Sequence, residues 1–194
     1  MNVLVCGVGG QGVLLFTGLL SQVALSAGRD VKKSEVHGMA QRGGSVSSHV
    51  RFGERVYSPL IEPGAAELIV AFERLEAVRY AHYLHPAGRM LYDPHRIDPL
   101  PVQIGLAERP TDAALEARLA ARTPALAVEA FAKARELGNP RVQNVVMLGA
   151  ASSFLEFPAD HYREAIRELV KPKFVELNLR AFDAGRALVA PAAV

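Results

Sequence analysis

The feature that most constrains the fold is a glycine-rich turn set between two apolar segments. Residues 3–5 read Val-Leu-Val, residues 6–12 read Cys-Gly-Val-Gly-Gly-Gln-Gly, and residues 13–20 are mostly apolar. This order predicts a buried strand, a tight turn and the first turns of a helix. Several backbone N–H groups and the positive end of a helix would then meet at one point, which suits a phosphate or another anionic group.

The spacing Gly7-x-Gly9-x-x-Gly12 also matches the fingerprint of dinucleotide-binding folds. The glycines would either help to bind a nucleotide or only permit a tight turn and close packing of the helix on the sheet. In a dinucleotide site an acidic residue about 20 residues further on binds the ribose. Glu35 is the candidate, but a glycine-rich loop follows it where a helix is expected. The spacing therefore favours a βαβ fold more than it favours NAD.

Periodicity and breaker residues predict an α/β fold: a Rossmann-like three-layer domain with a mixed sheet, a β-hairpin insertion and C-terminal helices. Residues 45–57 alternate polar and apolar side chains around Gly53-Glu54, which predicts the hairpin. Pro86 and Gly88 are expected to end a helix that begins at residue 73. The remaining predicted strands cover residues 30–36, 67–72, 90–92 and 126–128. The predicted helices cover residues 12–27, 73–84, 113–121, a segment ending at 137, 144–154, 159–170 and 174–188.

Length, charge and cysteine content limit the possible functions. The 194 residues predict one domain, 1–194, with a helical part from about 141 to 194. A net charge of +2 gives little support for a nucleic-acid partner. No apolar run approaches the ~20 residues that span a bilayer, and no leader opens the chain, so a cytoplasmic location without a membrane partner is expected. The single cysteine, Cys6, excludes an iron–sulfur cluster held by this chain alone.

A second glycine-rich segment, residues 37–44, reads His-Gly-Met-Ala-Gln-Arg-Gly-Gly. Adjacent glycines beside an arginine cost backbone entropy unless the chain must bend sharply or let another group come close. A ligand or subunit contact is favoured over a plain surface loop, with Gln41 and Arg42 as donors and Gly43 and Gly44 permitting the approach. His37 would act as a base or donor, although a lone histidine is more often structural.

Other polar residues are interpreted as structural. His82, His85, Asp93 and His95 suggest a metal only weakly, because Pro86 is expected to end their helix at once. Asn144 lies in an apolar stripe and must find a hydrogen-bond partner, so we expect it to help close the first glycine loop. The sequence has no serine elbow, no two-histidine zinc pattern and no Walker lysine. We therefore predict no catalytic residue and no metal site, and interpret the chain as a binding or assembly part.

Several of these segments together resemble the gamma subunit or domain of the 2-oxoacid:ferredoxin oxidoreductases. The block Gly-Met-Ala-Gln-Arg-Gly-Gly, residues 38–44, is the most specific part of the resemblance. From residue 35 to 61 the chain is most similar to the small (beta) subunit of the indolepyruvate branch of the family. The segments that carry the resemblance are residues 3–12, 34–46, 50–53, 57–59, 144–149 and 178–185.

The resemblance implies a role in the oxidative decarboxylation of a 2-oxoacid, here indolepyruvate or another arylpyruvate. It implies thiamine diphosphate and iron–sulfur clusters on a larger partner subunit, electron transfer to ferredoxin, and coenzyme A as acyl acceptor with a possible contact on this chain. The residues expected to bind a ligand or partner are Gly7, Gly9, Gly10, Gln11, Gly12, His37, Gln41, Arg42, Gly43 and Gly44. The alternative hypothesis is a self-sufficient NAD(P)-binding enzyme or a nucleotide-binding regulatory module.

Overall fold

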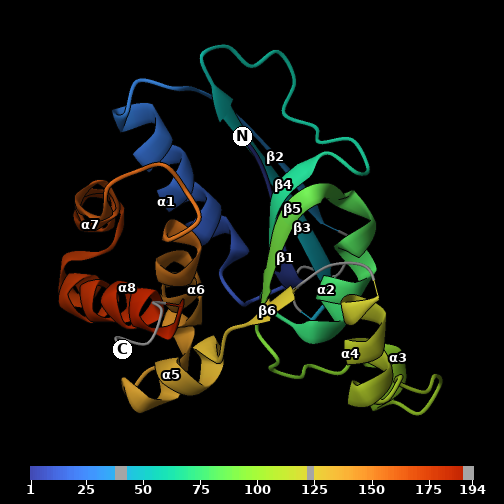
Figure 1. Ribbon diagram of the computed structural model, residues 1–194. Helices are drawn as coiled ribbons and strands as arrows, with labels where there is room; N and C mark the ends of the chain where they lie inside the picture. The colour runs from blue at the N-terminus through green and yellow to red at the C-terminus, as the bar shows by residue number, and fades with distance from the viewer. Residues whose placement is uncertain (38–42, 122–124, 190–194) are drawn as a thin grey trace, which may run out of the picture.

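The computed structural model describes residues 1–37, 43–121 and 125–189, with only the backbone of His37 included. Within these residues six strands form one sheet in the order β2-β3-β1-β4-β5-β6 (Figure 1). The strands are β1 (Asn2–Val8), β2 (Asp30–His37), β3 (Ser45–Gly53), β4 (Ala66–Ala71), β5 (Leu84–Tyr92) and β6 (Ala125–Ala127). The helices are α1 (Val13–Ser26), α2 (Arg74–Tyr80), α3 (Leu100–Gln103), α4 (Asp112–Ala120), α5 (Ala130–Glu136), α6 (Gln143–Ser152), α7 (Ala159–Leu169) and α8 (Val175–Val189), with short 3₁₀ turns η1 (Ala81–Tyr83), η2 (Pro140–Val142) and η3 (Pro172–Phe174).

The sheet is mixed, as the sequence predicts. β1, β4, β5 and β6 run parallel to one another, whereas β3 is antiparallel to both β1 and β2. β1 and β2 are therefore parallel, as in a βαβ unit, but β3 is inserted between them. This insertion is the difference from an ordinary dinucleotide fold, in which the two strands are adjacent.

The predicted position of the hairpin is wrong. β3 pairs with β2, from Asp30 opposite Gly53 to His37 opposite Val46, so the connection is the glycine-rich segment and not Gly53-Glu54. Residues 55–57 form no strand. Because β1 and β2 already occupy both edges of β3, a returning strand has no free edge to pair with. The backbone N–H of Val56 instead donates to Asp30 Oδ2 at 2.8 Å.

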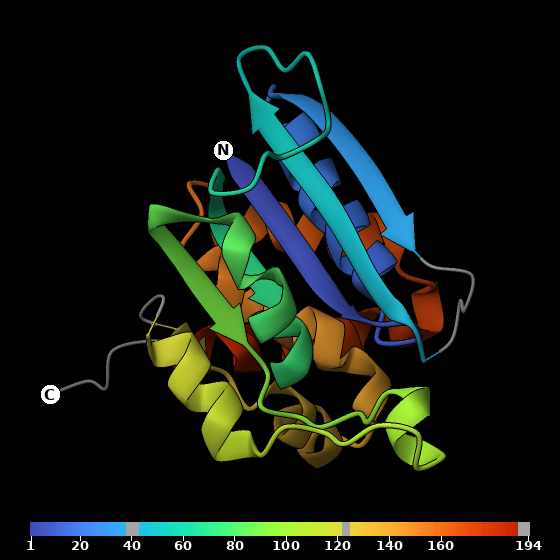
Figure 2. The ribbon, with the colours of Figure 1, turned by 90° about the vertical axis from the view of Figure 1, so that its right-hand side faces the viewer.

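Helices cover both faces of the sheet (Figures 1 and 2). α1, α6, α7 and α8 lie on one face, and α2 and α4 lie on the other. One apolar core joins the first helix layer to the sheet through Phe16, Val146 and Tyr162 among others. A smaller core joins α2 and α4 to the sheet through residues such as Ile69 and Met90. None of the helices in the described residues has both the length and the apolar content needed to cross a bilayer.

The expected stop at Pro86 and Gly88 is also corrected. α2 ends at Tyr80, and after one 3₁₀ turn β5 begins at Leu84, so both residues lie inside a strand. The pairing of β4 with β5 shifts register between Ala66 and Leu68, and this irregularity accommodates a proline that has no N–H to donate. A Cβ on Gly88 would lie 2.7 Å from the carbonyl oxygen of Ala66, so the glycine permits the close approach of the two strands.

α6 and α8 cross at unusually short range because each contributes a glycine to the contact. A Cβ on Gly149 would lie 2.0 Å from the carbonyl oxygen of Phe182, and a Cβ on Gly185 would lie 1.9 Å from that of Val146. These distances are far shorter than any side chain tolerates. The glycines at residues 149 and 185 are thus explained by packing and are not part of a ligand site.

Candidate functional site

The candidate site lies at the edge of the sheet where the parallel strands β1, β4 and β5 end. The chain leaves β1 into α1 on one face of the sheet and leaves β4 into α2 on the other face (Figure 1). Such a reversal leaves a crevice outside the carboxyl ends of the strands, which is where α/β proteins usually bind their ligands. The first glycine loop connects β1 to α1 at this edge of the sheet.

The glycines of this loop are required by its geometry. Gly10 and Gly12 have φ angles of 107° and 84°, in the region that favours glycine. A Cβ on Gly12 would lie only 2.3 Å from Asn144 Nδ2. A Cβ on Gly7 would lie 3.0 Å from Gln11 Oε1 and 3.1 Å from the Cβ of Phe72. The expected partnership of Asn144 with the loop is confirmed, since its Nδ2 donates to the carbonyl oxygen of Gly12 at 3.3 Å.

The structure brings the two glycine-rich segments together. The backbone N–H of Gly9 donates to the carbonyl oxygen of Gly44 at 2.8 Å, and the N–H of Gly43 donates to that of Gly9 at 3.2 Å. Gln41 and Arg42, together with the side chain of His37, lie outside the described residues. Gly43 and Gly44 nevertheless fix where this segment rejoins the sheet, directly beside Gly9.

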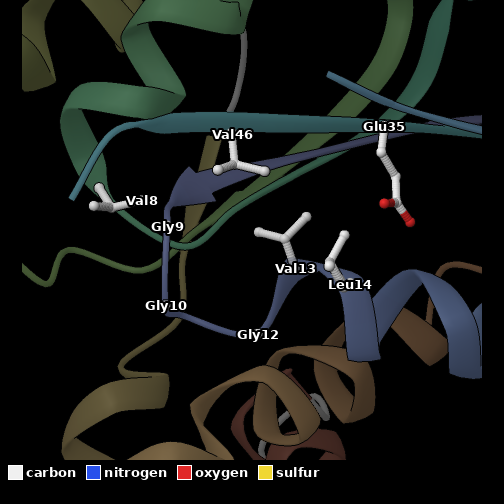
Figure 3. Close-up of a pocket in the computed structure, with 8 residues that line it drawn as sticks. All are labelled: Val8, Gly9, Gly10, Gly12, Val13, Leu14, Glu35 and Val46. Atoms are coloured by element: carbon white, nitrogen blue, oxygen red, sulfur yellow. The ribbon is translucent and has the colours of Figure 1, made fainter. Parts of the chain in front are cut away.

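A pocket of about 410 Å³ opens beside the first glycine loop (Figure 3). Most of its wall is apolar, and Glu35 is the ionisable side chain among the described lining residues. Glu35 projects from β2 toward the first turn of α1 (Figure 3) and forms an ion pair with Lys33 at 2.8 Å. The pocket is lined by Val8, Gly9, Gly10, Gly12, Val13, Leu14, Glu35 and Val46.

Fewer loop amides are available to a ligand than the sequence suggests. The N–H of Gly9 is used by Gly44, and the N–H of Gln11 donates to the carbonyl oxygen of Val8 at 3.1 Å. Within the described residues the N–H groups of Gly10 and Gly12 make no hydrogen bond. The N-cap residue of α1 is Gly12, which has no side chain to cap the helix, so the positive end of α1 lies beside the pocket without a cap from its own N-cap residue.

The side chain of Gln11 is used inside the fold. Its Oε1 accepts the N–H of Val8 at 2.7 Å, and its Nε2 donates to the carbonyl oxygen of Phe72 at 2.7 Å. The same Nε2 donates to Gln143 Oε1 at 3.3 Å. Gln11 thus links the end of β1 to the residue that follows β4, and these contacts hold the glycine loop in place.

This network continues to Asp93, a residue that sequence reasoning considered only for a metal. Gln143 Nε2 donates to Phe72 O at 3.0 Å and to Asp93 Oδ2 at 2.8 Å, and the N–H of Phe131 donates to that Oδ2 at 2.7 Å. Burial of the carboxyl group raises the pKa of Asp93 to about 6, although the hydrogen bonds oppose that shift. Two signals in the sequence could have identified Asp93 and Gln143. Asp93 is an acidic residue directly after a buried strand, and Gln143 directly precedes Asn144.

A second buried carboxylate supports the start of β3. The hydroxyl of Ser45, the residue after Gly44, donates to Glu76 Oε2 and lies 3.3 Å from Tyr80 Oη. Glu76 is 2% exposed, and burial raises its pKa, with Arg79 at 3.2 Å opposing the shift. The base of the second glycine segment is therefore fixed to α2 on the opposite face of the sheet.

The residues considered for metal binding make other contacts. His95 stacks on Phe131 with ring centroids 3.6 Å apart, and His85 Nδ1 accepts the N–H of Ala87. In the described parts of the chain no three His, Cys, Asp or Glu side chains are grouped so that they could hold a metal ion. Cys6 is buried in β1, and its Sγ lies 3.8 Å from the carbonyl oxygen of Glu76. One buried thiol does not fit an iron–sulfur cluster, which needs about four thiolates.

Comparisons with known proteins agree with this architecture. The gamma subunit of a keto/oxoacid ferredoxin oxidoreductase from Geobacter sulfurreducens superposes with a TM-score of 0.70 at 22% identity, covering 95% of each chain. The 2-oxoglutarate:ferredoxin oxidoreductase from Magnetococcus marinus, solved with 2-oxoglutarate, coenzyme A and succinyl-CoA, gives a TM-score of 0.74 at 19% identity over 97% of this chain and 30% of that one. These likenesses show a shared fold.

Sequence similarity is more specific. Subunit IorB of the indolepyruvate oxidoreductase from Pyrococcus horikoshii is 42% identical over 188 residues, which is 95% of this chain and 93% of the relative. The alternative of a self-sufficient NAD(P) enzyme is not supported by these similarities. The model of the family described as pyruvate ferredoxin/flavodoxin oxidoreductase matches residues 2–188. The chain belongs to that family.

Proposed function

We propose that this chain is the small subunit of a 2-oxoacid:ferredoxin oxidoreductase that acts on indolepyruvate or a similar arylpyruvate. The observation that carries the proposal is the 42% identity to subunit IorB across nearly the whole of both chains. The gamma-subunit fold and the family match over residues 2–188 support it. The product of the complete enzyme would be an acyl-CoA, with the electrons passed to ferredoxin.

The cofactors of the reaction belong, in this proposal, to a larger partner subunit. Thiamine diphosphate bound there would supply the electron sink for decarboxylation, and iron–sulfur clusters would supply the path for the electrons. The buried position of Cys6 supports the placement of the clusters elsewhere. The role of this chain is then to complete the assembly and to shape the surroundings of the substrate.

We assign this role to the edge of the sheet where the two glycine-rich segments, residues 7–12 and 37–44, meet. The N–H groups of Gly10 and Gly12, which have no partner among the described residues, and the N-terminal end of α1 would face an anionic group of coenzyme A or of the partner subunit. Arg42 and Gln41 would add side-chain donors from the adjacent segment, while Gly43 and Gly44 let that segment approach. Gln11 keeps the loop in position through its contacts with Val8 and Phe72.

The test is to reconstitute this chain, in the absence of oxygen, with a candidate larger subunit that carries thiamine diphosphate and iron–sulfur clusters. We expect reduction of ferredoxin by indolepyruvate and coenzyme A only when both subunits are present, and weaker activity with pyruvate or 2-oxoglutarate. Turnover of indolepyruvate by the larger subunit alone at the same rate would overturn the proposal. NADH fluorescence titration of the isolated chain tests the alternative, and saturable NADH binding would favour it.

Arg42→Ala tests the assigned surface, with Arg118→Ala on α4 as the matched control. We expect Arg42→Ala to raise the KM for coenzyme A or to weaken assembly by at least about tenfold, because a charge-assisted hydrogen bond is lost. The control variant is expected to leave both unchanged. Equal activity of the Arg42 variant across coenzyme A concentrations, with normal assembly, would reject the role of Arg42.

A further inference from the structure

A second cavity, of about 280 Å³, is lined by residues of α1, α6, α7 and α8. Leu15 lines it from α1, and Asn144 and Asn178 line it from α6 and α8. These asparagines begin the two C-terminal segments on which the family resemblance rests, and the glycines of the same segments form the helix crossing. The cavity is lined by Leu15, Asn139, Arg141, Val142, Asn144, Leu169, Val170, Lys171, Phe174, Leu177 and Asn178.

The charge of this cavity is opposite to that of the glycine-loop pocket. Arg141 and Lys171 are its ionisable lining residues, and no acidic side chain of the described residues lines it. Neither cation forms an ion pair within the described part of the chain, whereas neighbouring Arg163 and Lys133 do. Two uncompensated cations around one cavity produce a positive potential that favours an anion.

The remaining lining residues indicate that the anion carries an apolar part. Phe174 is 41% exposed and lies beside Leu177 and Leu169 at the cavity wall. Asn178 is only 5% exposed, and its Nδ2 donates to the carbonyl oxygen of Phe174 at 2.8 Å, so its amide group is fixed at the cavity wall.

We propose that this cavity binds a small organic anion, in which a phosphate or carboxylate group contacts Arg141 and Lys171 and a ring or chain packs on Phe174 and Leu177. Arginine is suited to the first contact because its planar fork matches an oxyanion in two parallel hydrogen bonds. The volume of about 280 Å³ exceeds what a bare inorganic ion would fill and lies just below the usual range of ligand pockets, which fits a small organic anion.

Asn144 connects this cavity to the glycine loop. It lines the cavity, and its Nδ2 donates to the carbonyl oxygen of Gly12, which lines the other pocket. A ligand in the cavity is therefore expected to change the backbone environment of Gly12, 3.3 Å from Asn144. This inference does not rest on the proposed function, since binding is measured on the chain without its partner.

Titration calorimetry of the full chain with AMP, adenosine, phenylacetate, benzyl alcohol and inorganic phosphate tests the proposal. We expect AMP or phenylacetate to bind one site with a Kd below about 1 mM. Each should bind more tightly than inorganic phosphate and than its uncharged analogue, which is adenosine for AMP and benzyl alcohol for phenylacetate. Binding by AMP alone would identify a phosphate ligand, and binding by phenylacetate alone a carboxylate. NMR should show shifts at the Asn144 and Asn178 side-chain amides and at Gly12.

The variant Arg141→Gln with Lys171→Gln should weaken binding at least tenfold. The control Arg118→Gln with Lys133→Gln removes one arginine and one lysine away from the cavity and should leave the Kd unchanged. Absence of saturable binding by every anion would overturn the proposal. Equal Kd values for the wild type and the Arg141/Lys171 variant would also overturn it, as would equal weakening of binding in the control variant. Ligand-induced NMR shifts confined to Glu35 and Val46 would place the ligand in the other pocket and overturn the proposal as well.

Discussion

Gly12 and Asn144, separated by 132 positions in the chain, are in such close contact that a Cβ on residue 12 would lie 2.3 Å from Asn144 Nδ2. The contact fixes the glycine loop against α6 from the side opposite the sheet. It also gives Gly12 two separate reasons to be glycine: the positive φ and the proximity of the amide group. These two effects can be distinguished by mutation.

Gly12→Ala is expected to lower the free energy of unfolding by about 2–3 kcal/mol, because strain at positive φ and the clash with Asn144 add. Gly64 also has positive φ, at 77°, but a Cβ there meets nothing within 4 Å. Gly64→Ala should therefore cost only about 1 kcal/mol. Urea unfolding of both variants, and of Gly12→Ala combined with Asn144→Ala, provides the measurement. Strict additivity of the double variant would contradict the proposed clash.

Gly149→Ala should be among the most destabilising substitutions in the chain. The new methyl group would lie 2.0 Å from the carbonyl oxygen of Phe182, so α6 and α8 must separate, and we expect a loss of about 3 kcal/mol or more. Gly18 in α1 is the matched control, because a Cβ there meets nothing within 4 Å. Gly18→Ala should stabilise the protein by about 0.5–1 kcal/mol through helix propensity. Similar thermal midpoints for the two variants would show that α6 and α8 can accommodate a methyl group at residue 149.

Asp93 should make stability depend on pH. Its pKa is raised from 3.8 to about 6 by burial, so between these values the folded chain binds more protons than the unfolded chain. The free energy of unfolding therefore falls as pH rises through this window, by up to about 3 kcal/mol from this residue. Asp93→Asn should flatten the slope in urea unfolding between pH 4 and 6.5, whereas Asp160→Asn, at an 80% exposed side chain, should not. Parallel pH profiles for the wild type and the Asp93 variant would refute this role.

Ser45→Ala should loosen the junction between the two glycine segments. It removes the hydroxyl that donates to buried Glu76, and the adjacent Gly43 and Gly44 hold Gly9 by backbone hydrogen bonds. A local cost of about 1–2 kcal/mol would speed amide exchange at Gly9 and Gly43 roughly tenfold. The comparison is Ser153→Ala, at an exposed serine after α6, in hydrogen-exchange NMR. Unchanged exchange at both glycines would mean that Glu76 does not support this segment.

The local parts of the fold could be predicted from the sequence because they depend on short-range patterns. The first strand, the glycine turn and α1 lie where the apolar runs and glycines indicate. The helices from Gln143 onward also agree with their predicted ranges within a few residues. Strand order was beyond such reasoning. Nothing local to residues 45–53 distinguishes a strand that returns on itself from one inserted between β1 and β2.

The candidate site was predictable only in part for a similar reason. The glycines and Asn144 were identified because each is anomalous in its own segment. Gln143, Asp93 and Glu76 were missed as supporting residues, because their importance arises from partners 50 or more positions away or on the opposite face of the sheet. The raised pKa values of Asp93 and Glu76 likewise depend on burial in the assembled fold, so the residue spacing near them in the sequence does not predict these shifts.

The position of β3 has a consequence for synthesis of the protein. β1 is made first, yet its two hydrogen-bonding neighbours are β3, from residue 45, and β4, from residue 66. During translation the backbone of β1 thus leaves the ribosome before either of the strands that pair with it. Closing the sheet around β1 requires contacts of long sequence separation, which slows folding.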